Sequence, residues 1–173
     1  MRLSFLNAGL ACFVAAYGLT TAPEAQATTT STYVFATGSG CQLSIPTTNT
    51  GVRPRATGFR NESTTVSNFV ICPMPSPNSS GFTSVIFALY SLDGVSRDVT
   101  CTAVKNWFGS SPTYSSKTLA VTTTTAWQNL TWDASDFGGT AGDPVLLMSV
   151  TCLLPPQTAV DAYNATYNSE IGA

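Results

Sequence analysis

The sequence comprises 173 residues with 43% apolar side chains, seven Lys and Arg residues, nine Asp and Glu residues and no histidine. This length suits one domain after a leader, and the net charge of -2 argues against a basic nucleic-acid-binding surface. The absence of imidazole excludes catalytic triads that need His as the general base and removes the commonest transition-metal ligand.

Residues 1–27 have the features of a secretory signal peptide. Arg2 supplies a positive charge, residues 3–20 are nearly all small or apolar, and Ala25-Gln26-Ala27 is a small-x-small cleavage signature. We therefore expect cleavage after Ala27 and a secreted or periplasmic mature protein. No later apolar run approaches the length of a membrane-spanning helix, so no membrane span is expected after cleavage.

Residues 28–40 are expected to form a polar N-terminal lead-in to a single domain at 41–173. Within the lead-in, 28–32 is expected to be mobile, 33–35 to form a short strand and 37–40 to form a turn. Turn-forming residues divide the remaining chain into eight expected strands: 51–59, 64–72, 83–92, 98–106, 114–121, 126–132, 145–154 and 159–167. Asp93-Gly94 is the clearest hairpin signal.

Apolar side chains alternate with polar ones in the expected strands, which is the period of a half-buried sheet. The best example is 145–154, and another is 98–106, where Cys101 falls on the apolar face. No segment shows sustained helical periodicity. The pattern predicts an all-β protein with an antiparallel two-sheet β-sandwich of jelly-roll-like form. The expected core face of the last long strand consists of Leu146, Met148, Val150, Cys152 and Leu154.

Four cysteines remain after the leader, an even number that predicts two disulfides in an exported protein. Four cysteines allow three connectivities. We prefer Cys41–Cys72 and Cys101–Cys152, because the second pair joins two apolar strand faces. A four-Cys zinc site is disfavoured, since no CxxC pair is present.

Carboxylates offer two kinds of chemistry. Asp133, Asp136 and Asp143 lie in one Gly-rich loop, where hard oxygen ligands could hold a structural Ca²⁺, although Asp and Gly are also typical of solvent loops. No other cofactor is expected. A carboxylate-dependent hydrolase would need two acidic groups facing one bond, and the sequence pairs none of the mature chain's eight acidic residues.

Aromatic side chains on a β-sandwich can stack on sugar rings. Trp107, Tyr114 and Trp127 are the candidates for ligand binding, and core packing is the competing explanation for each. Trp127 lies out of phase with Leu130 and Trp132, which places it on the solvent side of its strand. Arg53, Arg55 and Arg60 are interpreted as charges that, with Pro54, protect an edge strand, or alternatively as an anion site.

Several short motifs resemble those of a set of small exported bacterial proteins of unknown function. These motifs are Gly58-Phe59-Arg60-Asn61-Glu62-Ser63, Val70-Ile71-Cys72-Pro73, Val99-Thr100-Cys101, Trp127-Gln128-Asn129-Leu130 and Cys152-Leu153-Leu154-Pro155. The resemblance covers about residues 40–167, implies a secreted, disulfide-bonded β-sandwich and transfers no activity. The Trp-x-x-Leu stretch is also similar to a strand of jelly-roll carbohydrate-binding modules, without transferring a ligand.

These observations lead to a functional hypothesis. We expect a non-catalytic exported protein that serves as an extracellular or periplasmic binding or surface-associated module, with a glycan or an extracellular protein as its partner. The first alternative is a carbohydrate-binding protein that uses exposed aromatic side chains, with a glycan as partner. The second is a secreted carboxylate-dependent hydrolase.

Overall fold

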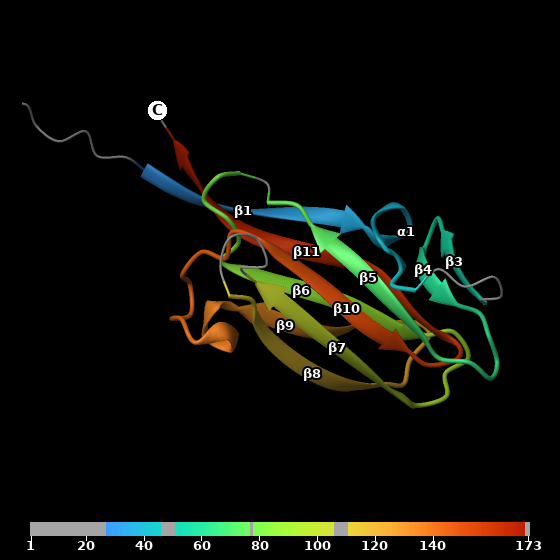
Figure 1. The fold of residues 1–173 in the computed structure, drawn as a ribbon. Coiled ribbons are helices and arrows are strands. Elements are labelled where there is room, and N and C mark those ends of the chain that lie inside the picture. The colour runs from blue at the N-terminus through green and yellow to red at the C-terminus, as the bar shows by residue number, and fades with distance from the viewer. Residues whose placement is uncertain (1–26, 46–50, 77, 106–110, 172–173) are drawn as a thin grey trace, which may run out of the picture.

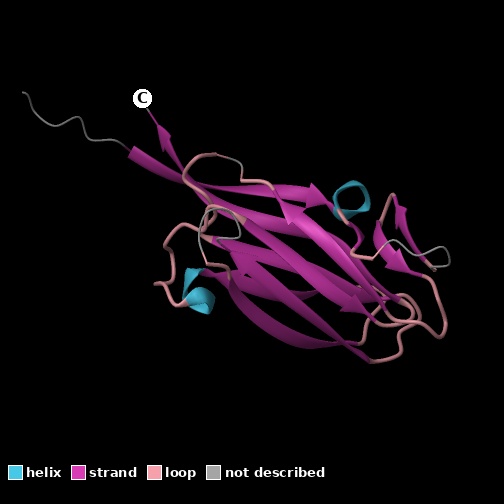
Figure 2. Ribbon diagram, in the orientation of Figure 1, coloured by secondary structure: helices cyan, strands magenta, loops and turns pink. Residues whose placement is uncertain are grey.

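The computed structural model describes residues 27–45, 51–76, 78–105 and 111–171, and two antiparallel β-sheets make up most of it (Figures 1 and 2). The expected signal peptide, apart from Ala27, lies outside the described residues. Within the described part, no helix is long and apolar enough to cross a membrane. The all-β, two-sheet fold class predicted from strand periodicity is confirmed.

The first sheet, called sheet A, has six strands. Its hydrogen-bonded order is β3 (Val52–Arg55), β4 (Gly58–Asn61), β11 (Thr158–Ile171), β6 (Ser84–Ser91) and β9 (Gln128–Asp133), and β1 (Ala27–Ala36) also pairs with β11. β11 is long enough to pair with both β4 and β1 along one of its sides: Thr158–Val160 face β4, and Ala162–Ile171 face β1.

The second sheet, called sheet B, has five strands. Its order is β2 (Gln42–Leu43), β5 (Asn68–Met74), β10 (Met148–Leu154), β7 (Arg97–Lys105) and β8 (Thr113–Val121). Two short helical turns complete the described elements, α1 (Thr37–Gly40) after β1 and η1 (Ala134–Phe137) after β9. Figure 2 shows both turns at the periphery of the strands.

The core lies between the inner faces of the two sheets and follows the predicted alternation. Val99, Cys101 and Ala103 of β7 are fully buried, as are Val150 and Cys152 of β10. Aromatic rings fill the centre: Phe87 stacks on Tyr163 with ring centroids 5.6 Å apart and meets Trp132 edge-on at 6.4 Å. The Tyr163 hydroxyl donates to the Pro73 carbonyl at 2.7 Å, which links sheet A to sheet B, and burial raises the pKa of Tyr163 to about 12.

Two disulfides join Cys41 to Cys72 and Cys101 to Cys152, which is the preferred pairing. Cys101 and Cys152 are direct register partners on β7 and β10. Cys41 precedes β2, whose register with β5 places it beside Cys72. Both disulfides therefore link neighbouring strands of sheet B on its buried face.

Residues 28–32, expected to be a mobile lead-in, instead belong to a strand that also contains the short strand expected at 33–35. Residues 27–36 form the full-length strand β1, and residues 37–40 form α1 rather than a turn. The prediction failed because the segment is polar and repetitive, whereas Thr is a β-branched residue that suits a strand once a partner is present. That partner is the C-terminal half of β11, which is distant in the sequence.

Several strand boundaries also differ from prediction. The strand expected at 51–59 is a hairpin of β3 and β4 that turns at Ala56-Thr57. The described residues contain eleven strands, whereas eight were expected in addition to the short strand at 33–35. Asp93-Gly94 does form a turn, but β6 and β7 belong to different sheets, so it is a sheet-to-sheet connection and not a hairpin. Leu146 precedes β10 and is 54% exposed, outside the core face expected for it.

Candidate functional site

A pocket of about 210 Å³ lies on the outer face of sheet A. The pocket lies over three residues that are neighbours across the sheet. Ala159 of β11 pairs with Arg60 of β4 on one side and with Tyr90 of β6 on the other. The small Ala159 side chain leaves room between these two larger ones. The lining residues are Thr57, Arg60, Tyr90, Thr124, Thr125, Ala126, Trp127 and Asp161.

Trp127 forms one wall of the pocket and is 64% exposed, in agreement with its predicted solvent-facing position. Leu89 pairs with Gln128, so the next register position brings Trp127 opposite Tyr90. The loop that carries Trp127 is held by Gln128. The Gln128 Oε1 atom accepts from the backbone N–H groups of Thr122 and Thr123, and its Nε2 donates to the Ala120 carbonyl. The indole is therefore presented on an ordered loop.

A β-bulge supplies the acidic group of the pocket. Val160 pairs with Leu89 and Ala162 pairs with Ala88, so Asp161 is the extra residue with no partner on β6. A bulge re-aims a side chain in this way. Thr37 of α1 stabilises the bulge, because its hydroxyl lies 2.7 Å from the Val160 carbonyl and 2.6 Å from the Asp161 carbonyl. Among the described residues, no hydrogen bond or ion pair engages the Asp161 carboxylate.

The basic group of the pocket is Arg60, whose guanidinium lies over the Tyr90 ring at 5.6 Å and donates to the Thr57 hydroxyl. The Tyr90 hydroxyl donates to the Thr57 carbonyl at 3.0 Å, which fixes the ring. Within the described part of the chain, Arg60 forms no salt bridge and its Nε atom is buried without a hydrogen-bond acceptor. The guanidinium therefore keeps donors that its neighbours do not use.

The other two arginines of the cluster serve a different role. The Arg55 guanidinium binds both carboxylate oxygens of Glu62, at 2.7 and 2.8 Å, and Arg53 lies 3.4 Å from the same group. The hydrogen bond from Arg55 lowers the pKa of the Glu62 carboxyl. Because β3 is the end strand of sheet A, Arg53, Pro54 and Arg55 occupy a sheet edge, as the edge-strand interpretation predicted.

Tyr114, another of the aromatic candidates, does not line this pocket. Tyr114 is as exposed as Trp127, but it lies near the start of β8 in sheet B, whereas Trp127 follows the far end of that strand. The seven residue-to-residue steps from Tyr114 to Val121 span about 23 Å of extended chain. Trp107 lies outside the described residues.

Local hydrogen bonds occupy the three aspartates proposed for calcium. The Asp133 carboxylate caps η1 by accepting from the Ser135 N–H and hydroxyl, and the hydroxyl bond in particular lowers the pKa of Asp133. Asp136 accepts from the Asp133 N–H and from the Lys117 ammonium, and Asp143 accepts from the Thr140 N–H. No group of three acidic, Cys or His side chains suited to a metal occurs among the described residues.

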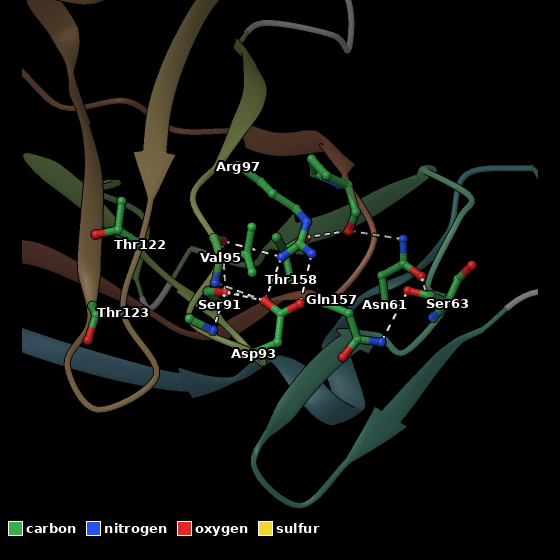
Figure 3. Close-up of polar contacts among 12 residues, drawn as sticks. Asn61, Ser63, Ser91, Asp93, Val95, Arg97, Thr122, Thr123, Gln157 and Thr158 are labelled. Carbon is green, nitrogen blue, oxygen red and sulfur yellow. Dashed lines mark hydrogen bonds and ion pairs between the residues drawn. The ribbon is translucent and has the colours of Figure 1, made fainter.

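The carboxyl groups of Glu62, Asp93 and Asp133 have lowered pKa values, which makes them unsuited to general-acid catalysis. Asp93 receives two hydrogen bonds from the Arg97 guanidinium at 2.6 and 2.8 Å, with further bonds from the Ser91 hydroxyl and the Val95 N–H (Figure 3). The Arg97 bonds are the main cause that holds the pKa of Asp93 far below its usual range. A glycosidase acid needs a raised pKa, whereas those of Glu62, Asp93 and Asp133 are lowered.

Sequence reasoning identified Trp127 and missed its partners Tyr90 and Asp161. Tyr90 could have been found, because Phe87 and Leu89 point inward and the alternation of β6 directs Tyr90 outward. The position of Asp161 depends on the bulge, for which the sequence carries no recognisable signal. Arg60 was noted only as a member of a charge cluster.

No protein-family model and no curated protein matches this chain. Similar solved structures include a family 11 carbohydrate-binding module from Clostridium thermocellum in complex with a β-1,3-1,4-mixed-linked tetrasaccharide, at a TM-score of 0.37 and 15% identity over 83% of this chain and 89% of that chain. Another is TmCBM61 in complex with β-1,4-galactotriose, at a TM-score of 0.37 and 10% identity over 81% of this chain and 88% of that one. At these scores the similarity supports no statement about the ligand of this chain.

Proposed function

We propose that this protein binds a glycan, without turning it over, in the pocket between Trp127, Tyr90, Arg60 and Asp161. The observation that carries the proposal is the exposed indole of Trp127 beside two charged groups. Among the described residues, no hydrogen bond or ion pair engages the Asp161 carboxylate, and the Arg60 guanidinium forms no salt bridge and has an Nε atom without an acceptor. The face of an indole matches the apolar C–H face of a pyranose. Carboxylate and guanidinium groups form charge-assisted hydrogen bonds, and both can engage two neighbouring hydroxyls at once.

Hydrogen bonds hold the residues around the pocket in place without a ligand, which supports a binding role. Gln128 holds the Trp127 loop, Tyr90 is fixed by the Thr57 carbonyl, and Thr37 stabilises the bulge at Asp161. A site that is ordered before its ligand arrives loses less conformational entropy on binding. An open pocket with a few polar groups around an aromatic wall suits part of a longer glycan chain. The candidate roles of the protein therefore narrow to ligand binding, and its two disulfides favour an exported protein.

The test is retention of the disulfide-bonded protein on a panel of soluble and insoluble polysaccharides, followed by titration of the retained glycan. We expect saturable binding that Trp127→Ala weakens by about tenfold or more, as for a central aromatic anchor. Tyr114→Ala is the matched control, because Tyr114 is equally exposed but lies on the other sheet. Asp161→Asn should also weaken binding.

Two outcomes contradict the proposal. The first is a wild-type protein that no glycan of the panel retains. The second is retention that Trp127→Ala and Tyr114→Ala change to the same extent, which would place the ligand elsewhere.

A further inference from the structure

The strand β1 forms a long edge of sheet A. Its ten residues pair with β11, and within the described residues no strand lies on its other side. β6 stops pairing with β11 at Thr166, so residues 167–171 of β11 pair with β1 alone. Figure 1 shows this two-stranded ribbon running out beyond the other strands.

The directions of the backbone N–H and C=O groups of β1 follow from the hydrogen bonds of its partner strand, β11. The Thr166 carbonyl accepts from the Thr83 N–H, and the Asn168 carbonyl accepts from the Asn78 side chain, both on the side of β11 away from β1. In an antiparallel pair, residues opposite such groups also turn their own N–H and C=O groups away. Thr32 and Thr30, which face Thr166 and Asn168, therefore present these groups at the open edge. By alternation, Val34 does the same.

The other sheet edges carry features that block strand addition, and β1 does not. β3 has Arg53, Pro54 and Arg55, and β2 has only two residues. The Lys117 ammonium of β8 reaches across to the Thr131 carbonyl of β9 and so covers the neighbouring edges of both sheets. Charges, proline and short length are the usual means of protecting an edge. β1 contains no charged residue and no proline.

We propose that the open edge of β1 is a pairing surface for a second copy of this chain, with the two β1 strands antiparallel across a twofold axis. A register centred on Thr32 places Thr30 opposite Val34 of the partner strand and pairs outward-facing backbone groups with each other. This register forms about ten new interstrand hydrogen bonds. The strand has no charge that would select an oppositely charged partner. Its Thr and Val side chains can instead lie opposite those of a second β1 strand without repulsion.

The test is sedimentation velocity of the protein purified after export from a producing host, over a concentration series. We expect a dimer that dissociates on dilution. The double variant Thr30→Lys/Val34→Lys should raise the dissociation constant by about tenfold or more, because the twofold pair sets lysines opposite each other. Val34 is 63% exposed, so the monomer fold should tolerate the change.

The control variant Val66→Lys/Val95→Lys adds the same charge at loop positions of similar exposure and should leave the dimer intact. Thr32→Pro, which removes one outward N–H group, gives a second route to dissociation without added charge. Slowed hydrogen exchange at the amides of Thr30, Thr32 and Val34 in the dimer would locate the interface. A wild type that stays monomeric at all concentrations, or a dimer unchanged by both edge variants, overturns the proposal.

Discussion

The two sheets hold their shape by different means. Sheet B contains both disulfides, and cross-strand hydroxyl pairs such as Thr100–Thr118 and Thr102–Ser116 line its outer face. Sheet A contains no disulfide, but it has the bulge at Asp161, the Trp127 pocket and the open edge of β1. The covalent constraints therefore lie in the sheet away from the proposed binding features, and the geometry of those features depends on packing and hydrogen bonds.

The largest expected effect comes from removing the disulfide between β7 and β10. Cys101→Ala/Cys152→Ala should lower the free energy of unfolding by about 4 kcal/mol, because the crosslink spans 51 residues and its loss restores chain entropy to the unfolded state. Urea denaturation measures the loss. Glycan affinity of the folded protein should be retained, since the pocket lies on the other sheet.

The second disulfide provides the comparison. Cys41→Ala/Cys72→Ala opens a shorter span of 31 residues and should cost about 0.4 kcal/mol less in the same chain-entropy model. A loss below about 1 kcal/mol for either double variant would show that sheet B does not depend on its crosslinks.

Gly58→Ala tests how sheet A depends on close packing. Gly58 has a φ of +120°, and an added Cβ would lie 2.4 Å from the Val160 carbonyl oxygen. We expect a loss of about 2 to 4 kcal/mol in the free energy of unfolding, from backbone strain and overpacking together. Glycan affinity should fall as well, because the displaced segment includes Val160 and the neighbouring bulge at Asp161.

Gly138→Ala is the matched control for this prediction. Gly138 also has a positive φ, of +80°, but nothing lies within 4 Å of an added Cβ. This variant should show the cost of backbone strain alone, about 1 kcal/mol. Equal losses in the two variants would contradict the role assigned to the contact between Gly58 and Val160.

The elements that sequence reasoning predicted well are those whose alternation is local and strong. β6, β7 and β8 match the expected strands to within a residue or two, and the buried cysteines fall where the apolar faces require them. Only residues 33–35 of β1 were predicted as a strand, because the Thr-rich segment before them has no apolar face and pairs only with the distant strand β11. The β3–β4 hairpin was missed because charged residues flank Pro54 on an edge strand.

The candidate site was only partly predictable for a related reason. Trp127 was found from its phase within one strand, which is a local property. Arg60 and Tyr90 become neighbours only because both pair with Ala159 in the middle of sheet A. Strand order and bulges depend on contacts between distant segments, and the turn at Asp93-Gly94 shows that a strong local signal does not determine which sheet the next strand enters.

The smallest expected effect concerns that turn, which connects sheet A to sheet B. Arg97 and the other donors hold the pKa of Asp93 well below its usual range, so the ionised carboxyl stabilises the folded state at neutral pH. A group with a lowered folded-state pKa contributes stability above its unfolded pKa, and this contribution is lost as the pH falls. Asp93→Asn should therefore be less stable than the wild type at neutral pH, and the difference in the free energy of unfolding should shrink below about pH 4.

Because the Asp93–Arg97 pair is exposed, high salt should also reduce this difference. Urea denaturation from neutral pH to about pH 2 measures the trend, and a difference that stays constant with pH would mean that the Asp93 carboxylate does not stabilise the connection between the two sheets.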